Sequence, residues 1–228
     1  MVLEAMDPVS HDQPDRLVVR TITRITPGKR RPNRANVYLD GKFAFACNLN
    51  VVARFKLREG RKLDADELER IERGEIRQEC FDKAMRFLQT RLHSRSELRR
   101  KLIRNEYTPG MADEVLDDLA RMDYINDERF ALAKARSAAT HKHQGRRRAM
   151  MELLKVGVKA EVANRAIDEV FDPADSVATA RDLALRQAPR LRKLQPEVAR
   201  RRLVGMLQRR GFDYSDIKPV IDEMLGNG

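Results

Sequence analysis

Few side chains of this sequence stand where they could perform covalent chemistry or hold a metal. His141 and His143 flank Lys142, a spacing that puts the two imidazoles on poorly matched sides of a helix, so we expect a surface loop. The carboxylate pairs Asp117-Asp118 and Asp168-Glu169 recur along the chain, whereas a catalytic pair is expected to occur once. We therefore predict no metal site and no enzyme activity.

Nucleotide cofactors are not expected either. The sequence contains neither the glycine-rich phosphate loop that ends in Lys-Ser or Lys-Thr nor the Gly-x-Gly-x-x-Gly dinucleotide loop. Cys47 and Cys80 lie far apart, and in a reducing compartment we expect two small buried hydrophobic residues without a disulfide. We predict that the protein carries no cofactor.

The chemistry that the sequence does offer is the binding of phosphate groups by basic side chains. Of 228 residues, 46 are Lys or Arg and 35 are Asp or Glu, which gives a formal net charge of +11. Residues 16–62 contain thirteen Lys and Arg against two acids, whereas residues 1–15 contain four acids and no Lys or Arg. Such segregation favours a polyanionic partner, nucleic acid ahead of a membrane surface. A solvated basic face that serves solubility alone is the alternative.

The basic segment has the pattern of a small β-element. Asp40-Gly41 between two apolar stretches is typical of a tight hairpin, because glycine tolerates the positive φ of that turn. A turn-rich loop before it holds three candidate nucleic-acid contacts, Lys29, Arg30 and Arg31. The elements expected next are a short helix over 50–55, a strand over 57–63 and a charged helix from Asp64 to Gly74.

From Cys80 onward the hydrophobic period becomes that of helices. Ser94 and Glu97 predict a capping box, in which the serine accepts from one amide of the first turn and the glutamate from another. Further residues that can cap a helix start are Thr108, Asn126 and Asp172.

These helices belong to an internal repeat. Residues 101–119 align without a gap fifty-one positions on with 152–170, and fifty-four positions further the register continues to 220–224. One more helix precedes each copy, over 81–92, 128–139 and 174–188. Three short amphipathic helices can bury a common face and stack on the next unit. We predict a mostly α fold of tandem three-helix repeats in an elongated curved array, with a small N-terminal β-element.

The predicted organisation has five parts. They are a flexible acidic N-terminus (1–15), a small basic module with the β-hairpin (16–76), and three-helix repeats 1 (77–126), 2 (127–171) and 3 (172–228). Gly157 and Gly211 stand where the second helix of repeats 2 and 3 must end, which predicts left-handed capping residues. Repeat 1 has Glu106 there, so its turn either differs or is closed by Asn105.

The second helix of each repeat is basic and the third leans acidic. The candidate binding residues are Arg95, Arg99 and Arg100 in repeat 1, Arg146, Arg147 and Arg148 in repeat 2, and Arg200, Arg201 and Arg202 in repeat 3. In repeats stacked in register these helices form a basic stripe that meets phosphates or an acidic protein groove. The arginines could instead pair with the acidic third helices, which contributes little per exposed pair. Both interpretations stay open for repeat 1; binding is favoured for the two triplets, because three successive arginines point to several sides of a helix.

Three runs in the helical region are similar to the signature of a known family. They are A-M-R-F-L … R-L-H-S-R-S-E-L-R-R-K-L over 84–102, L-D-D-L … Y-I-N-D-E-R-F-A over 116–131, and G-R-R-R … E-L-L … G-V over 145–158. In this order they resemble the RecX regulators of the RecA recombinase, and the resemblance covers Cys80 to Leu225.

The resemblance implies a bacterial, cytoplasmic, non-enzymatic modulator. It would bind the RecA filament on single-stranded DNA and suppress filament growth and strand exchange, and with them DNA repair, recombination and the SOS response. Double-stranded DNA is a further expected partner, and we expect a monomer without membrane contact, since no run approaches the roughly 18–20 apolar residues of a span. The residues alone also fit a helix-turn-helix-like DNA-binding transcription regulator, or a scaffold that binds only protein.

Overall fold

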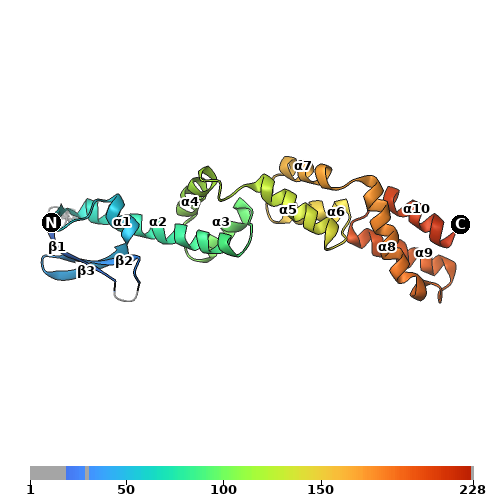
Figure 1. Cartoon of the computed structure of the whole chain (residues 1–228), viewed down its shortest axis with the longest axis horizontal. Coiled ribbons are helices and arrows are strands. Elements are labelled where there is room, and N and C mark those ends of the chain that lie inside the picture. The colour runs from blue at the N-terminus through green and yellow to red at the C-terminus, as the bar shows by residue number, and fades with distance from the viewer. Residues whose placement is uncertain (1–18, 29–30, 227–228) are drawn as a thin grey trace, which may run out of the picture. The chain divides into compact units, whose positions relative to one another are not determined.

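The computed structural model describes residues 19–28 and 31–226, and this part of the chain is mostly helical (Figure 1). It contains ten helices and four strands within the described residues. The chain divides into two compact units, residues 1–83 and 84–228.

The first unit is built on an antiparallel sheet. Its strands are β1 (Arg20–Pro27), β2 (Arg34–Leu39), β3 (Lys42–Asn48) and β4 (Lys62–Leu63), in the order β3-β2-β1-β4. Asp40 and Gly41, with φ of 50° and 80°, form the predicted hairpin turn between β2 and β3. The strand expected over 57–63 is reduced to the two residues of β4, which pair with the start of β1.

Helices cover one face of this sheet, and the core of the unit lies between them. Along β2 the side chains alternate between buried and half-buried. The buried side chains pack against α1 (Leu49–Arg54) and the first half of α2 (Ala65–Thr90), through Val51 and Ile71 among others. Cys47 lies in this core and Cys80 is buried further along α2; both are free thiols, as expected, and burial raises the pKa of each to about 11.

The two helices expected at 64–74 and 81–92 are one continuous helix, α2, so Gly74 does not end a helix. A Cβ on Gly74 would lie 2.4 Å from Cε2 of the Phe55 ring, closer than real Cβ contacts come. Glycine is therefore required here by the close approach of an aromatic ring to the helix backbone, not by a turn. Asp64 caps the helix as predicted, accepting from the Glu67 amide at 2.7 Å.

The second unit consists of tandem three-helix repeats, as predicted. The end of α2 is followed by α3 (Arg95–Arg104) and α4 (Pro109–Arg121) in repeat 1, by α5 (Asp127–Thr140), α6 (Arg146–Lys155) and α7 (Ala160–Val170) in repeat 2, and by α8 (Pro173–Leu191), α9 (Pro196–Arg210) and α10 (Tyr214–Leu225) in repeat 3. Repeats 2 and 3 each enclose their own cluster of buried apolar side chains. Each three-helix unit therefore has a core of its own.

The predicted capping residues begin their helices. Side-chain oxygens accept an amide of the first turn at Ser94, Thr108, Asn126 and Asp172. The capping box expected at Ser94 is half formed: Ser94 accepts from the Glu97 amide at 3.1 Å, but the Glu97 carboxylate pairs with Arg91. A nearby guanidinium attracts the carboxylate more strongly than a neutral amide does.

The second helix of every repeat ends in the same left-handed turn. The φ angle is 69° at Glu106, 83° at Gly157 and 92° at Gly211. In each turn the amide of the following residue donates to a carbonyl five residues earlier. Asn105 has a φ of −98°, so it does not close the turn of repeat 1; Glu106 itself takes the left-handed conformation, at about 1–2 kcal/mol.

Glycine in repeats 2 and 3 is required by contact with the preceding repeat. A Cβ on Gly157 would lie 2.2 Å from the Ser96 Oγ, and one on Gly211 would lie 2.4 Å from the backbone nitrogen of Arg148. The turn after α6 thus docks on the start of α3, and the turn after α9 docks on the start of α6. Glu106 is exposed, so the same turn accepts a side chain there.

The docked helix ends also exchange hydrogen bonds. The Ser94 hydroxyl donates to the Val156 carbonyl at 2.7 Å, while the amides of Gly145 and Arg147 donate to the carbonyls of Arg210 (2.9 Å) and Gly211 (3.0 Å). A helix leaves unpaired amides at its start and unpaired carbonyls at its end, with opposite partial charges. Each joint therefore satisfies groups that an isolated helix leaves to water.

Replacing Gly211 by Ala is expected to destabilise the protein by more than the about 1–2 kcal/mol of left-handed strain, because the methyl group also collides with the α6 backbone. Gly60→Ala is the matched control, since Gly60 has a φ of 80° and no atom within 4 Å of the added Cβ. Denaturant unfolding measures both variants. Equal losses of unfolding free energy in the two variants would show that the docking contact is not the reason for glycine at position 211.

Candidate nucleic-acid interface

One ion pair recurs at the same place in all three repeats. Arg95 pairs with Asp117 at 2.7 Å, Arg146 pairs with Asp168, and Arg200 lies 3.7 Å from Asp222. Each pair joins the second helix to the third helix across the same spacing of twenty-two residues. Arg95 and Arg146 are the first residues of their helices, whereas Arg200 is the fifth residue of α9. These three candidate arginines therefore have a structural partner inside their own repeat.

A fourth candidate, Arg99, is held in the same way. Its guanidinium donates two hydrogen bonds to Asp113, at 2.7 and 3.0 Å. These bonds lower the pKa of Asp113 below its usual value. Pairing between the basic second helix and the acidic third helix thus occurs in every repeat.

The other candidates in the triplets are much less neutralised. Arg147 is 70% exposed and lies 3.7 Å from Asp213, across the joint to repeat 3. Arg148 is half exposed, lies 3.7 Å from Glu152 and donates to the Arg209 carbonyl at 3.1 Å. Arg201 and Arg202 are exposed and form no ion pair with any described residue. In repeat 1, the Arg100 guanidinium donates to the Lys155 carbonyl at 3.5 Å and forms no ion pair within residues 19–28 and 31–226.

The joint between repeats 2 and 3 gathers basic side chains that sequence spacing does not bring together. A cavity of about 350 Å³ there is lined by Lys142, Gln144, Arg148, Met206, Arg209 and Arg210, and we call it the joint pocket. The Arg210 guanidinium donates to the Lys142 carbonyl at 3.2 Å, across the joint. Four cations around one cavity of this size can hold an anionic group such as a phosphate.

Glu152 is the carboxylate that holds the joint pocket together from inside repeat 2. It accepts from Gln144 at 2.8 Å and from Lys142 at 3.1 Å, and Lys134 lies 3.4 Å away. Burial would raise its pKa, but the hydrogen bonds from Gln144 and Lys142 and the two lysine charges outweigh burial and lower the pKa to about 2. Glu152 is thus ionised at neutral pH.

The Glu152 pKa sets a pH window for stability. A carboxylate whose pKa is lower in the folded than in the unfolded chain stabilises the fold above about pH 4.3, and that contribution is lost as the pH falls towards about 2. We expect Glu152→Gln to lose less stability than the unchanged protein between these two values. The exposed Glu128→Gln, which removes a pair with Arg165, is the control. Chemical unfolding across the range measures it; identical acid profiles for Glu152→Gln and the unchanged protein would refute the assignment.

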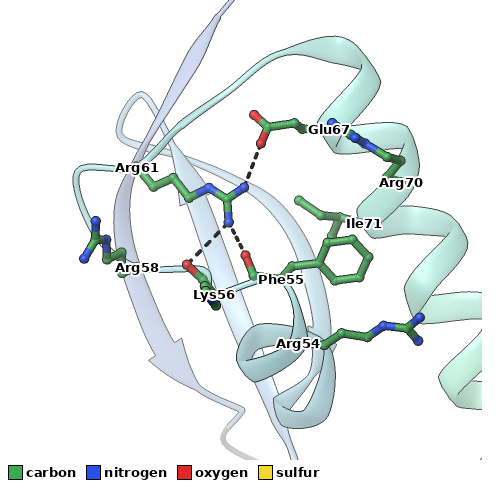
Figure 2. Close-up of a pocket in the computed structure, with 8 residues that line it drawn as sticks. All are labelled: Arg54, Phe55, Lys56, Arg58, Arg61, Glu67, Arg70 and Ile71. Atoms are coloured by element: carbon green, nitrogen blue, oxygen red, sulfur yellow. Dashed lines mark hydrogen bonds and ion pairs between the residues drawn. The ribbon is translucent and has the colours of Figure 1, made fainter.

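A second basic pocket lies in the first unit, between the loop after α1 and the start of α2 (Figure 2). Its volume is about 680 Å³, and its cations are Arg54, Lys56, Arg58, Arg61 and Arg70, against the single carboxylate of Glu67. We call it the α1–α2 pocket. Of its cations, Arg54, Lys56, Arg58 and Arg70 are exposed.

Arg61 holds the walls of this pocket together, so its charge is used inside the protein and not for a ligand. Figure 2 shows its guanidinium between the loop and the helix, where it donates to the carbonyls of Phe55 and Lys56 and, at 2.7 Å, to Glu67. Lys56 has a φ of 51°, a conformation that a lysine adopts only when its surroundings hold it. The loop that presents Lys56 and Arg58 is therefore fixed on α2.

The sequence predicts only some of the residues of this basic surface. Lys29 and Arg30 lie outside the described residues, and Arg31 is exposed beside the sheet. It did not single out Lys142, Arg209 and Arg210 as one site, because only the docking of α9 on α6 joins them. Nor did it single out the α1–α2 pocket, although the charge excess of residues 16–62 was a signal for it.

Repeated three-helix units, joined end to end and bearing arginines without partners, define a helical-repeat protein with basic surfaces, preceded by a basic strand module. Residues 20–64 match the RecX N-terminal domain, and residues 80–119, 126–167 and 174–221 match the first, second and third three-helix domains of RecX. The chain belongs to the RecX family of regulatory proteins.

Individual relatives agree with this family. The regulatory protein RecX of Listeria monocytogenes is 30% identical over 202 residues, 89% of this chain and 75% of that protein. That of Bacillus subtilis is 28% identical over 203 residues, covering 89% and 76%. A crystal structure of regulatory protein RecX aligns with a TM-score of 0.78 at 24% identity over 89% of this chain and 99% of that one, and supports the fold. Within the described residues, no helix has the length and apolar character that crossing a membrane requires.

Proposed function

We propose that this protein is a non-enzymatic modulator that acts in the cytoplasm on the RecA filament assembled on single-stranded DNA. It binds the filament through the basic helices of the repeats and restrains filament growth and strand exchange, and thereby DNA repair, recombination and the SOS response. Membership of the RecX family supports the proposal, together with the resemblance of residues 84–158 to RecA regulators.

The observation that carries the proposal is the end-to-end docking of the basic helices. Because α9 docks on α6 and α6 on α3, exposed arginines recur at corresponding positions of successive repeats, as at Arg147 and Arg201. Arg147 lies 3.7 Å from Asp213, and Arg201 has no ion-pair partner among the described residues. A filament also presents its phosphates and acidic side chains at a regular repeat. Contacts of this kind weaken as salt rises, because phosphate binding releases counterions.

The alternative, a transcription regulator of the helix-turn-helix kind, is disfavoured by charge. Such domains place the last helix of the unit against DNA. Here the last helices α4, α7 and α10 carry the aspartates that pair with the basic helices, among them Asp117, Asp168 and Asp222. Each of these last helices contains more acids than bases, so a DNA-facing last helix would repel the phosphates. A transcription regulator would also prefer some duplex sequence over single-stranded DNA, which competition binding measures.

Co-sedimentation tests the proposal directly. We expect the purified protein to pellet with RecA assembled on single-stranded DNA and to slow the DNA-dependent ATPase of RecA. Binding to DNA without any effect on RecA, or no association with the filament at low salt, would overturn it.

Variants of neighbouring arginines in α9 distinguish a role in binding from a role in stability. Arg201→Ala combined with Arg202→Ala is expected to weaken filament and single-stranded DNA binding about tenfold and to leave the unfolding midpoint unchanged, because neither side chain has an ion-pair partner among the described residues. Arg200→Ala is the matched control: it removes the pair with Asp222, costs about 0.2–1 kcal/mol of stability and changes binding much less. Equal binding by both variants would exclude this face of α9.

We further propose that the α1–α2 pocket anchors the strand module on the nucleic-acid backbone, as expected for the basic segment 16–62. Arg54→Ala with Arg58→Ala should lower the slope of log affinity against log salt for single-stranded DNA by about 1.4, which corresponds to two lost phosphate contacts. Arg61→Ala is not suited to this test, since it removes the hydrogen bond to Glu67 that holds the loop after α1 on α2. A slope that does not change in the double variant would contradict the anchor.

A further inference from the structure

The sheet of the first unit has an open face opposite its core. The half-buried side chains of β2 that point away from the core include Asn36 and Tyr38. With Arg24 and Thr26 of β1 and with Arg31 they line a groove of about 800 Å³. An open sheet face with this mixture of aromatic, amide and basic side chains is not explained by packing within the unit.

Flat side chains are fixed on this face. The Arg24 guanidinium lies over the Tyr38 ring, with its carbon 4.3 Å from the ring centroid, a cation–π contact. Phe43, from the neighbouring strand β3, meets Tyr38 edge to face with centroids 5.9 Å apart, and it is 59% exposed. A phenyl ring so exposed leaves much of its surface unpartnered in the folded chain.

The charge around these rings is positive. Arg24 and Arg31 are exposed and form no ion pair with a described residue. Arg34 is neutralised, at 3.0 Å from both Glu75 and Glu79. Within the described part of the chain, the charged residues that line the groove are three arginines, Arg24, Arg31 and Arg34, against the one carboxylate of Glu79. The net charge that faces a ligand in this groove is therefore cationic.

We propose that this face binds single-stranded nucleic acid by stacking its unpaired bases. A base stacks on the Phe43 ring and another on the outer plane of the Arg24 guanidinium, while Arg31 meets a phosphate. Aromatic rings and arginine planes are the sequence-tolerant surfaces that such strands use, whereas duplex bases are already stacked on one another. The inference rests on the proposed function only in taking single-stranded DNA as the nucleic acid that this chain meets.

The chain contains no tryptophan, which makes a direct test possible. The full-length Phe43→Trp variant is expected to bind oligothymidylate with unchanged affinity. The fluorescence of its single indole should fall when oligothymidylate saturates the protein, because thymine stacks on the ring. Inorganic polyphosphate, which has charge but no bases, should bind without this quenching. Saturating oligothymidylate that leaves the emission unchanged would overturn the proposal.

Two more variants separate stacking from hydrophobic packing. Phe43→Leu keeps an apolar side chain but has no ring face, and both it and Phe43→Ala should weaken oligothymidylate binding about tenfold while changing duplex binding less than about twofold. Phe43 lies beside the groove, through its contact with the lining residue Tyr38, rather than among the lining residues themselves. Ile76→Ala is the control, since Ile76 is an exposed apolar residue of α2 that does not line the groove and has no aromatic ring. Wild-type affinity in Phe43→Leu, or an equal loss for single strand and duplex, would refute base stacking.

The outcome is distinguishable from that of the proposed function, because these measurements contain no RecA. Quenching of Phe43→Trp by oligothymidylate together with failure to pellet with RecA filaments would uphold the base-stacking face and reject the RecA modulator. The reverse pair of results would reject the face alone.

Discussion

The contact on which the helical unit depends is the docking of one helix end on the start of its counterpart in the preceding repeat. It needs a left-handed turn without a side chain, which only glycine provides at Gly157 and Gly211. At the joint of α6 and α9, amides at one helix start meet carbonyls at the other helix end, and at the joint of α3 and α6 the Ser94 hydroxyl meets the Val156 carbonyl. Both contacts satisfy backbone groups at a helix end. The order α9 on α6 on α3 follows from them.

This docking also decides what the arginines can do. The recurring pair between the second and third helices, Arg146 with Asp168 for example, ties each repeat together internally and uses one arginine of each triplet. Exposed pairs of this kind contribute little energy. The arginines one and two positions later point to other sides of the helix. In repeat 2 they lie 3.7 Å from Asp213 and Glu152, whereas Arg201 and Arg202 of repeat 3 have no ion-pair partner among the described residues and are available to a ligand.

The sequence predicts well whatever is local and repeated. The capping residues, the hairpin at Asp40-Gly41, the left-handed glycines and the repeat itself follow from residue types at short spacing. The prediction is wrong where a contact with a residue distant in sequence determines the conformation at a position. Gly74 has the pattern of a helix end, yet it accommodates Phe55, whose place depends on the whole first unit.

The candidate sites divide along the same line. That the basic helices face acidic ones could be foreseen, but which arginine finds an aspartate depends on the side of the helix on which each falls. The joint pocket combines residues about sixty positions apart, such as Arg148 and Arg209, so only the folded joint reveals it. Charge composition predicts the basic module, but it does not distinguish the roles of its arginines. Arg61 holds a loop on α2, whereas Arg58 is exposed.

The distribution of charge gives both units a part in the approach to a polyanion. Residues 16–62 carry a net charge of +11, but the acids of residues 1–15 and 63–83 reduce the first unit to +3, whereas residues 84–228 carry +8. Long-range attraction to a polyanion depends on net charge and is screened over about 8 Å at physiological salt. Attraction from a distance therefore comes from the helical repeats as well as from the basic segment of the strand module. At contact, the position of the individual exposed arginines and the joint between repeats determine which surface fits.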